Sequence, residues 1–337
     1  AGAPMSGVIS DLIGRRKTMV LSIFPMIAGL VLMGLYPVWP VFPMAYGLVM
    51  FGWAFVMVLA RASPADEIAA FDTTETVRRF TMVFMPAFAV DGACPLIGAA
   101  LLDSGLAPTD LYLIAALAGV VTMVSALALL RETLSDEVRE RARQGPTVNL
   151  RGLGRGFWWF ALGMLPFYFA FNMALPYFGN LCVGEWGVSP TVYAITWSAF
   201  SFTFALASYS ASGLADRAHA TGLIVALAMN ALIILLFGVG SGVLMMFLLE
   251  VIWAAPIAVW IGTENTFAVR GVDDDKQGRA LGTYDVLMRS TGLLAANVGA
   301  WVWTVSSSLR VLYVIAGVCG LLSLLLIRYS LGRIEAI

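Results

Sequence analysis

Four ionisable side chains interrupt stretches of this chain that are otherwise apolar: Asp91, Glu250, Asp285 and Arg289. A charged group among apolar residues is costly to place there, so it is usually retained for its chemistry. The carboxyl group of Asp91, within FAVDGACPLIGAALLD, could carry a proton. It could equally accept a hydrogen bond from the hydroxyl-rich stretch 191–213, and both interpretations stay open. The hydroxyl groups of that stretch belong to Thr196, Ser198, Ser201, Thr203 and Ser208.

Glu250 and the Asp285–Arg289 pair raise similar questions. A carboxyl group at 250 could bind a proton or a cation, accept hydrogen bonds from a bound molecule, or simply face water near the end of its stretch. Asp285 and Arg289 are four residues apart with the acid first, the favourable order for an ion pair within one helix. Mutual neutralisation is one interpretation of this pair. Contact of Arg289 with an anionic molecule, or a change of partner during a movement, is the other.

Aromatic side chains are concentrated in the segment FWWFALGMLPFYFAFNMALPYFGNL, residues 157–181. Tyr168 and Asn172 lie about one helical turn apart in its middle and combine a ring with an amide. In the segment 41–60, Trp53 is a comparable ring. Such surfaces suit an amphipathic or aromatic molecule, although packing against lipid or neighbouring helices explains them equally well.

The stretches that hold these residues are long and apolar enough to span a membrane. Hydrophobic residues make up 60% of the 337 residues and charged residues only 12%, whereas a soluble domain has about 25% charged residues. Roughly 20 apolar residues cross a bilayer, and they must be helical because lipid offers no partners to the backbone. We predict spans at 18–37, 41–60, 80–102, 109–130, 156–178, 191–213, 221–239, 243–262, 280–303 and 309–330.

Basic residues are confined to one side of these spans. Alternate loops and their helix ends carry 18 of the 20 Lys and Arg residues, and the opposite loops carry none. Basic loops stay in the cytoplasm, so we expect an integral protein of a bacterial cytoplasmic (inner) membrane. The chain begins without Met, and its first ten residues read as the end of a helix whose beginning is missing. The loops predicted to be cytoplasmic are 11–17, 61–79, 131–155, 214–220, 263–279 and 331–337.

Two segments of the chain resemble each other at a constant spacing. Residues 75–92 align with residues 275–292, which matches Arg79 to Arg279 and Gly92 to Gly292. The run GVISDLIGRRK at 7–17 has a counterpart in SGLADRAHA at 212–220, about 205 residues later. The repeat predicts two related helix bundles, 1–130 and 156–337, joined by a cytoplasmic loop at 131–155.

This organisation, together with the pattern Gly7, Asp11, Gly14, Arg15 and Arg16, resembles the major facilitator superfamily and its loop signature between helices 2 and 3. The resemblance covers the whole chain. It implies an all-α membrane fold of two six-helix bundles related by a pseudo-two-fold axis, with about 11 of 12 helices present. One departure is Leu12, which stands where the family commonly has an arginine.

The same resemblance implies a gate at the cytoplasmic loops. Gly7 would let two helices approach closely, and Asp11 would face the N–H groups at the start of helix 11, near 277–280. The rear copy of the motif keeps Asp216 and Arg217 but has Ser212 in the glycine position. The resemblance also places Trp53, Tyr168, Asn172 and Glu250 on helices that line a central cavity.

The leading functional hypothesis is therefore a secondary active transporter. It would move a small amphipathic or aromatic molecule by alternating access, with proton coupling as one option. The alternative is a non-transporting protein of the same fold: an assembly factor, a pigment or lipid handler, or a subunit of a larger membrane complex. No nucleotide motif or catalytic spacing appears, so we expect no enzyme, no cofactor and no metal site. The expected partners are membrane lipid, a small-molecule substrate and other membrane-protein subunits, but no nucleic acid.

Overall fold

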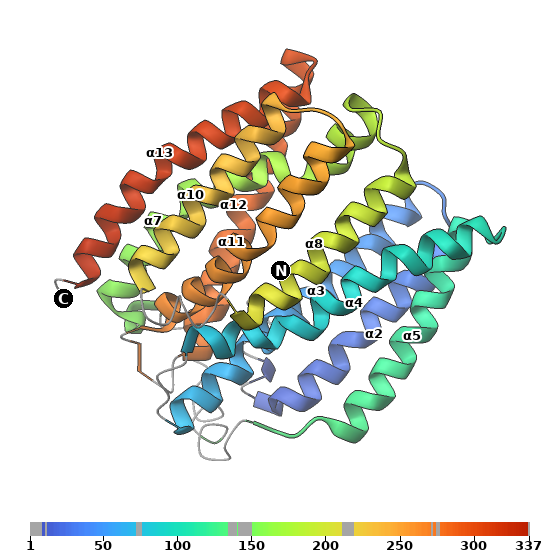
Figure 1. The fold of residues 1–337 in the computed structure, drawn as a ribbon. Helices are drawn as coiled ribbons and strands as arrows, with labels where there is room; N and C mark the ends of the chain where they lie inside the picture. The colour runs from blue at the N-terminus through green and yellow to red at the C-terminus, as the bar shows by residue number, and fades with distance from the viewer. Residues whose placement is uncertain are drawn as a thin grey trace. The chain divides into compact units, whose positions relative to one another are not determined.

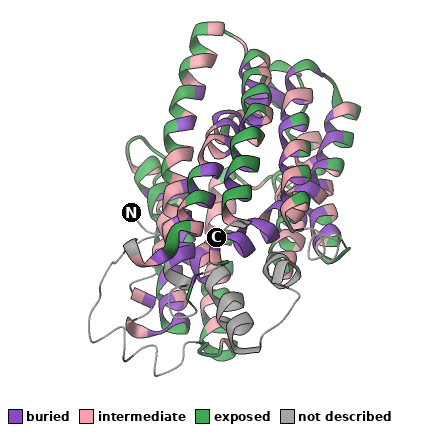
Figure 2. Ribbon diagram, turned by 90° about the vertical axis from the view of Figure 1, so that its left-hand side faces the viewer, coloured by how far each residue is buried: buried purple, intermediate pink, exposed green. Residues whose placement is uncertain are grey.

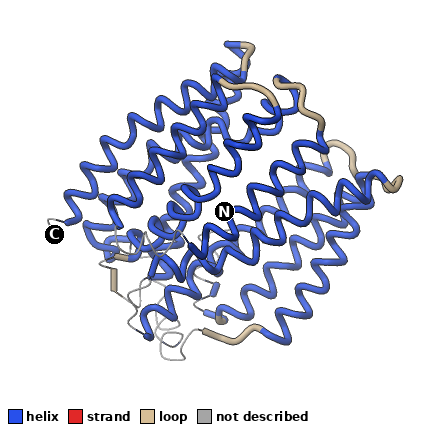
Figure 3. Tube along the Cα trace, in the orientation of Figure 1, coloured by secondary structure: helices blue, strands red, loops and turns tan. Residues whose placement is uncertain are grey.

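The computed structural model describes residues 9–10, 12–71, 76–133, 140, 150–210, 219–270, 272–273 and 277–335. Within these ranges, the side chains of 61–71, 76–81, 83–84, 150–151, 219, 277–279 and 335 are not described. The described chain is helical and contains no strand (Figure 3). Four of the gating residues predicted from the sequence lie outside the described residues: Gly7, Asp11, Asp216 and Arg217.

Long helices follow one another along the chain (Figure 1). A 3₁₀ turn at Leu150–Leu153 precedes α7, and a second 3₁₀ turn, Leu175–Tyr177, and a π-helical turn, η3 (Asn180–Glu185), follow it. The long helices are α2 (Arg15–Leu35), α3 (Val41–Phe71), α4 (Thr76–Asp103), α5 (Pro108–Leu129), α7 (Gly154–Ala174), α8 (Pro190–Ser210), α10 (His219–Val239), α11 (Val243–Val269), α12 (Gln277–Ser306) and α13 (Leu309–Glu335).

Eight of these helices are both long and apolar enough to cross a membrane among the residues described. The other two, α8 and α12, are long enough but more polar, because they carry many of the hydroxyl and ionisable groups noted above. The rest of the protein leaves large apolar residues such as Leu129, Leu206 and Leu244 more than 70% exposed. In Figure 2 buried and exposed residues alternate along the helices. Such exposed side chains are suited to contact with lipid.

The helices extend further than the predicted spans. The sequence predicted loops at 61–79 and 263–279, but α3 continues to Phe71, α4 begins at Thr76 and α11 continues to Val269. The predicted loop bounds were therefore wrong. Hydropathy locates the part of a helix that can lie in hydrocarbon, whereas polar residues can continue the same helix beyond it.

The described helices pack as two compact units. The first takes in Ala1–Asp72, Gly98–Gly152 and Asp273–Asp285, and within it α2 packs against both α3 and α5. The second takes in Thr73–Ile97, Leu153–Val272 and Val286–Ile337. The first parts of α4 and α12 thus each pack with helices of the other sequence half, and the two helices begin at nearly the spacing of 200 that the repeat predicts. The predicted bounds of the two bundles stay a prediction.

Small residues allow the helices of the second unit to approach closely. A Cβ atom at Gly317 of α13 would lie 2.6 Å from the Cβ atom of Leu235 in α10. On α12, a Cβ atom at Gly299 would overlap the backbone carbonyl oxygen of Met173 in α7. The hydroxyl group of Tyr177 donates a hydrogen bond of 2.6 Å to the carbonyl oxygen of Ala296 on the same face. This close packing positions α7 against its neighbours.

Candidate functional site

Aromatic rings of α7 and α11 form a cluster in the second unit. The ring of Trp260 meets Phe167, Tyr168 and Phe171 edge to face, with centroid distances of 5.2, 5.4 and 5.0 Å. These residues recur at helical spacing on α7, so a single face of that helix presents all three rings. Phe167 and Trp260 are buried, whereas Tyr168 remains half-buried. Part of the cluster is therefore accessible from outside the unit.

A carboxylate completes this cluster. The hydroxyl group of Tyr168 donates a hydrogen bond of 2.7 Å to Oε1 of Glu264, whose residue is only 2% exposed. The Nδ2 group of Asn172 donates to the backbone carbonyl oxygen of Tyr168 at 2.9 Å. Its Oδ1 atom lies 3.3 Å from the place of a Cβ atom at Gly292 on α12, where a larger residue would crowd it. The result is a site with apolar ring faces and fixed polar groups at one edge.

Sequence reasoning missed Glu264 because it assigned residues from 263 onward to a loop. A usable signal was present, since Trp260 and Glu264 are four residues apart and share a helix face once α11 continues to Val269. Hydropathy alone ended the span too early to find it.

Glu250 takes no part in the Tyr168–Glu264 hydrogen bond, and its predicted place beside a central cavity stays a prediction. It lies on α11, 14 residues before Glu264, which corresponds to about 21 Å along a helix. The residue is completely buried, and neither carboxylate oxygen has a hydrogen-bond partner. The nearby hydroxyl group of Thr196 donates instead to the backbone oxygen of Tyr193, at 3.0 Å. Hydropathy placed Glu250 in a helix but could not determine which way its side chain faces.

Asp91 contacts the hydroxyl-rich helix, as one of its two interpretations proposed. Its Oδ2 atom accepts hydrogen bonds from Ser201 Oγ at 2.6 Å and from Trp197 Nε1 at 3.0 Å. Next to it, a Cβ atom at Gly92 would lie 3.1 Å from the ring of Phe202. The carboxylate therefore joins α4 to α8 at a point of close helix approach.

The remaining candidates of the spans occupy separate places. Asp285 is buried on α12 at 3% exposure, and Arg289 is half-buried one turn later; both have interaction partners. Trp53 lies on α3 in the first unit and is 39% exposed. The roles of these three residues stay predictions.

The described part of the gating motif is held by the end of α5. Gly14 precedes α2 with φ of 100°, a conformation that favours glycine. The backbone N–H of Arg15 donates to Glu132 Oε1 at 2.8 Å, and its guanidinium group donates to Ser10 Oγ. The guanidinium group of Arg16 donates to the Leu127 carbonyl oxygen near the end of α5. A cation at the C-terminus of a helix is favourably placed.

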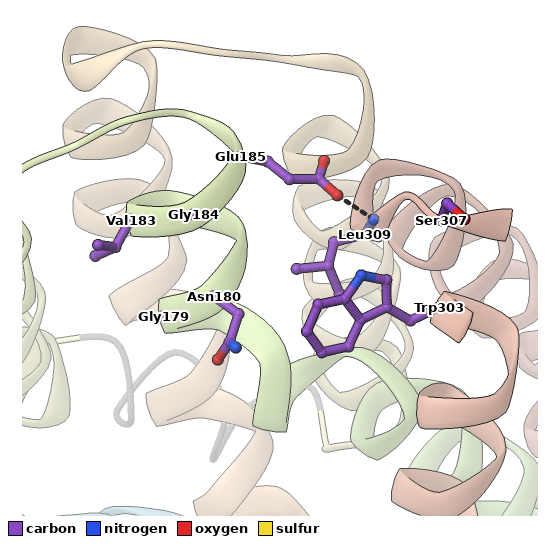
Figure 4. A pocket seen from close by; sticks show the side chains of 8 residues that line it. All are labelled: Gly179, Asn180, Val183, Gly184, Glu185, Trp303, Ser307 and Leu309. Atoms are coloured by element: carbon purple, nitrogen blue, oxygen red, sulfur yellow. Dashed lines mark hydrogen bonds between the residues drawn. The ribbon is translucent and has the colours of Figure 1, made fainter. Parts of the chain in front are cut away.

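A cavity of about 590 Å³ lies where the chain leaves α7 and where α12 connects to α13 (Figure 4). Asn180 and Glu185 line it from η3, and Trp303 lines it from α12. The Glu185 carboxylate accepts a hydrogen bond from the backbone N–H of Leu309, the first residue of α13, and lies 3.9 Å from Arg310 Nε. Glu185 therefore acts as a cap for α13.

Comparisons with known proteins agree with this architecture. The sequence profile of the Major Facilitator Superfamily matches residues 1–296. A search of curated proteins by sequence finds no match. The crystal structure of the human organic anion transporter MFSD10 (TETRAN) is similar with a TM-score of 0.74 at 16% identity, covering 97% of this chain and 80% of that chain.

Two bacterial transporters have similar structures. A crystal structure of the E. coli fucose:proton symporter FucP has a TM-score of 0.67 at 12% identity, covering 97% of this chain and 87% of that chain. A bacterial homologue of the iron transporter ferroportin, in an outward-facing state, has a TM-score of 0.62 at 16% identity, with 98% and 87% covered. The predicted all-α membrane fold is thereby confirmed, and the chain belongs to the major facilitator superfamily.

Proposed function

We propose that this membrane protein is a secondary active transporter that moves a small amphipathic or aromatic molecule by alternating access. The observation that carries the proposal is the Tyr168–Glu264 hydrogen bond at the edge of the Trp260 ring cluster. Rings supply apolar contact, and a buried carboxylate supplies a strong acceptor for a polar donor of the substrate. The names of the similar structures refer to different substrates: an organic anion, fucose and iron. The fold itself therefore does not determine the substrate.

In this proposal each residue has a distinct role. Trp260 and Phe171 contact the apolar part of the substrate. Glu264 accepts a hydrogen bond from its polar group, and Tyr168 orients that carboxylate. Asn172 borders the site next to Gly292, so α12 could change the shape of the site if it moved relative to α7. We further propose that the protein works in a bacterial cytoplasmic membrane, with its basic loops in the cytoplasm.

Ligand binding to the purified protein tests this proposal. The protein is heated with each member of a panel of aromatic amines, aromatic alcohols and sugars, and a compound that raises the melting temperature is then tested for counterflow in proteoliposomes. Tyr168→Phe should weaken binding of such a compound about tenfold, since a hydrogen bond to a charged group is worth about 1.5–3 kcal/mol.

Tyr329→Phe is the matched control. The Tyr329 hydroxyl group accepts hydrogen bonds from Arg333 on the exposed side of α13, and its removal should leave binding unchanged. Equal affinity of the Tyr168→Phe variant and the wild type would refute the site. Absence of counterflow for every compound, with a stoichiometric protein partner after purification from native membranes, would favour the non-transporting alternative.

A further inference from the structure

Glu250 is a buried acidic side chain of the second unit. It is completely buried on α11, and both of its carboxylate oxygens lack a hydrogen-bond partner. Buried polar groups in folded proteins nearly always have partners, and an unsatisfied one calls for an explanation such as a bound ion or proton. The Glu264 site does not account for Glu250, which lies about 21 Å further along the same helix.

Polar groups from three neighbouring elements surround this carboxyl group. Thr196 and Tyr193 of α8 and Cys182 of η3 lie near Glu250, and Tyr313 of α13 lies near Tyr193 and Cys182. Cys182 and Tyr313 are almost completely buried, and the Tyr313 hydroxyl group has no hydrogen-bond partner. The titratable groups among these neighbours are two phenols and a thiol, and none of them is a cation at neutral pH.

The Trp253 indole, close to Glu250 on the same helix, is not available as a donor to the carboxyl group. The indole Nε1 group of Trp253, on the next turn of α11, already donates to Oδ1 of Asn230 in α10 at 2.7 Å. The Trp253 ring packs against Phe178 and Phe237 at centroid distances of 6.1 and 5.7 Å. The Trp253 side of Glu250 is therefore apolar or already hydrogen-bonded. An ionised carboxylate without a compensating cation is very unfavourable in such surroundings.

We propose that Glu250 is a proton-binding site inside the second unit, separate from the Tyr168–Glu264 site, and that its carboxyl group carries a proton in the conformation described here. Release breaks the carboxyl O–H bond and passes the proton to water, which leaves a carboxylate. It therefore requires that water reach the buried Glu250 side chain. Coupling of this release to substrate movement rests on the proposed function, whereas proton binding itself does not.

Infrared spectroscopy of the purified protein in lipid vesicles tests the proton site directly. At pH 7, where an exposed glutamate with a pKa near 4.3 is ionised, the wild type should show a protonated carboxyl C=O band that Glu250→Gln removes. Glu185→Gln is the matched control: it makes the same replacement at a carboxyl group that contacts the start of α13 and Arg310, and it should leave the Glu250 band unchanged. Absence of a band that depends on Glu250 would overturn the proposal.

A sodium site is the competing explanation, and the same sample separates the two. Addition of NaCl at constant ionic strength, with choline chloride as the reference, should leave the Glu250 band unchanged. Loss of the band with sodium would overturn the proposal in favour of a cation site. If Glu250→Gln does not fold, Glu250→Asp takes its place. It keeps a carboxyl group in altered surroundings and should shift the band, and a band that neither shifts nor disappears would overturn the proposal.

Transport measurements distinguish failure of the proton site from failure of the proposed function. If a substrate shows counterflow, Glu250→Gln should retain counterflow but lose accumulation driven by a pH gradient. Undiminished accumulation in this variant would overturn the coupling role of Glu250. A Glu250 band without counterflow of any compound would contradict the proposed function while supporting the proton site.

Discussion

The hydrogen bonds of Asp91 allow a measurable test of the α4–α8 contact. Asp91→Asn keeps the shape of the side chain but replaces a charged acceptor by a neutral one, and Ser201→Ala removes the shorter of its two hydrogen bonds, at 2.6 Å. The second bond, from Trp197 Nε1 at 3.0 Å, remains in the Ser201→Ala variant. A double-mutant cycle over Asp91 and Ser201 therefore isolates a single charge-assisted hydrogen bond.

The coupling free energy of this cycle should be about 1–1.5 kcal/mol. A hydrogen bond to a charged group contributes about 1.5–3 kcal/mol, and we take a value at or below the lower limit because Trp197 Nε1 still donates to the same oxygen atom when Ser201 is replaced. Ser201 is completely buried and can turn its hydroxyl group back to its own helix, which further limits the loss.

Reversible unfolding in mixed detergent, followed by the near-ultraviolet signal of the tryptophans, provides the four free energies of the cycle. Ser198→Ala is the control, because the Ser198 hydroxyl group donates to Ala194 of its own helix and should show no coupling to Asp91. A coupling energy for Asp91 and Ser201 within error of zero would refute the contact. The other interpretation of Asp91, as a proton carrier, would then be favoured.

Three further predictions follow from the packing. Gly299→Ala should destabilise the protein by more than about 2 kcal/mol in the same unfolding assay, because its Cβ atom would overlap a backbone carbonyl of α7. The control is Gly282→Ala on the same helix, where the added Cβ atom meets open space and should be neutral or stabilising. Glu132→Ala should cost about 1 kcal/mol by uncapping α2, and a loss below the error of the measurement would contradict the capping role. Burial raises the pKa of the Cys182 thiol to about 12, so little of the reactive thiolate is present at pH 8. Mass spectrometry should therefore find Cys182 unmodified by maleimide at pH 8 until the protein is unfolded. Rapid labelling of the folded protein would contradict this expectation.

Hydropathy was sufficient to predict the membrane helices, because lipid imposes helical structure and long apolar runs on any chain that crosses it. The family came instead from the internal repeat and the resemblance of the motif around Gly14, Arg15 and Arg16. The contact of Asp91 with the hydroxyl-rich helix was one of two open interpretations, and the structure supplies Ser201 as its partner. Glu264 was missed because its helix continues past the apolar stretch. The surroundings of Glu250 depend on the rotation of α11 about its axis, which side-chain packing determines and an apolar run on all faces does not reveal.

The carboxylate caps of α2 and α13 have different consequences for the order of events during synthesis. Arg15 leaves the ribosome 117 residues before Glu132, a delay of about 6–23 s at 5–20 residues per second. The first turn of α2 must therefore wait for its cap, with its backbone N–H groups bound to water, until α5 has been made. Glu185, by contrast, precedes Leu309 by 124 residues, so the cap of α13 is already present when that helix begins. The start of α2 is thus completed late in synthesis, whereas the start of α13 can be completed as soon as it emerges.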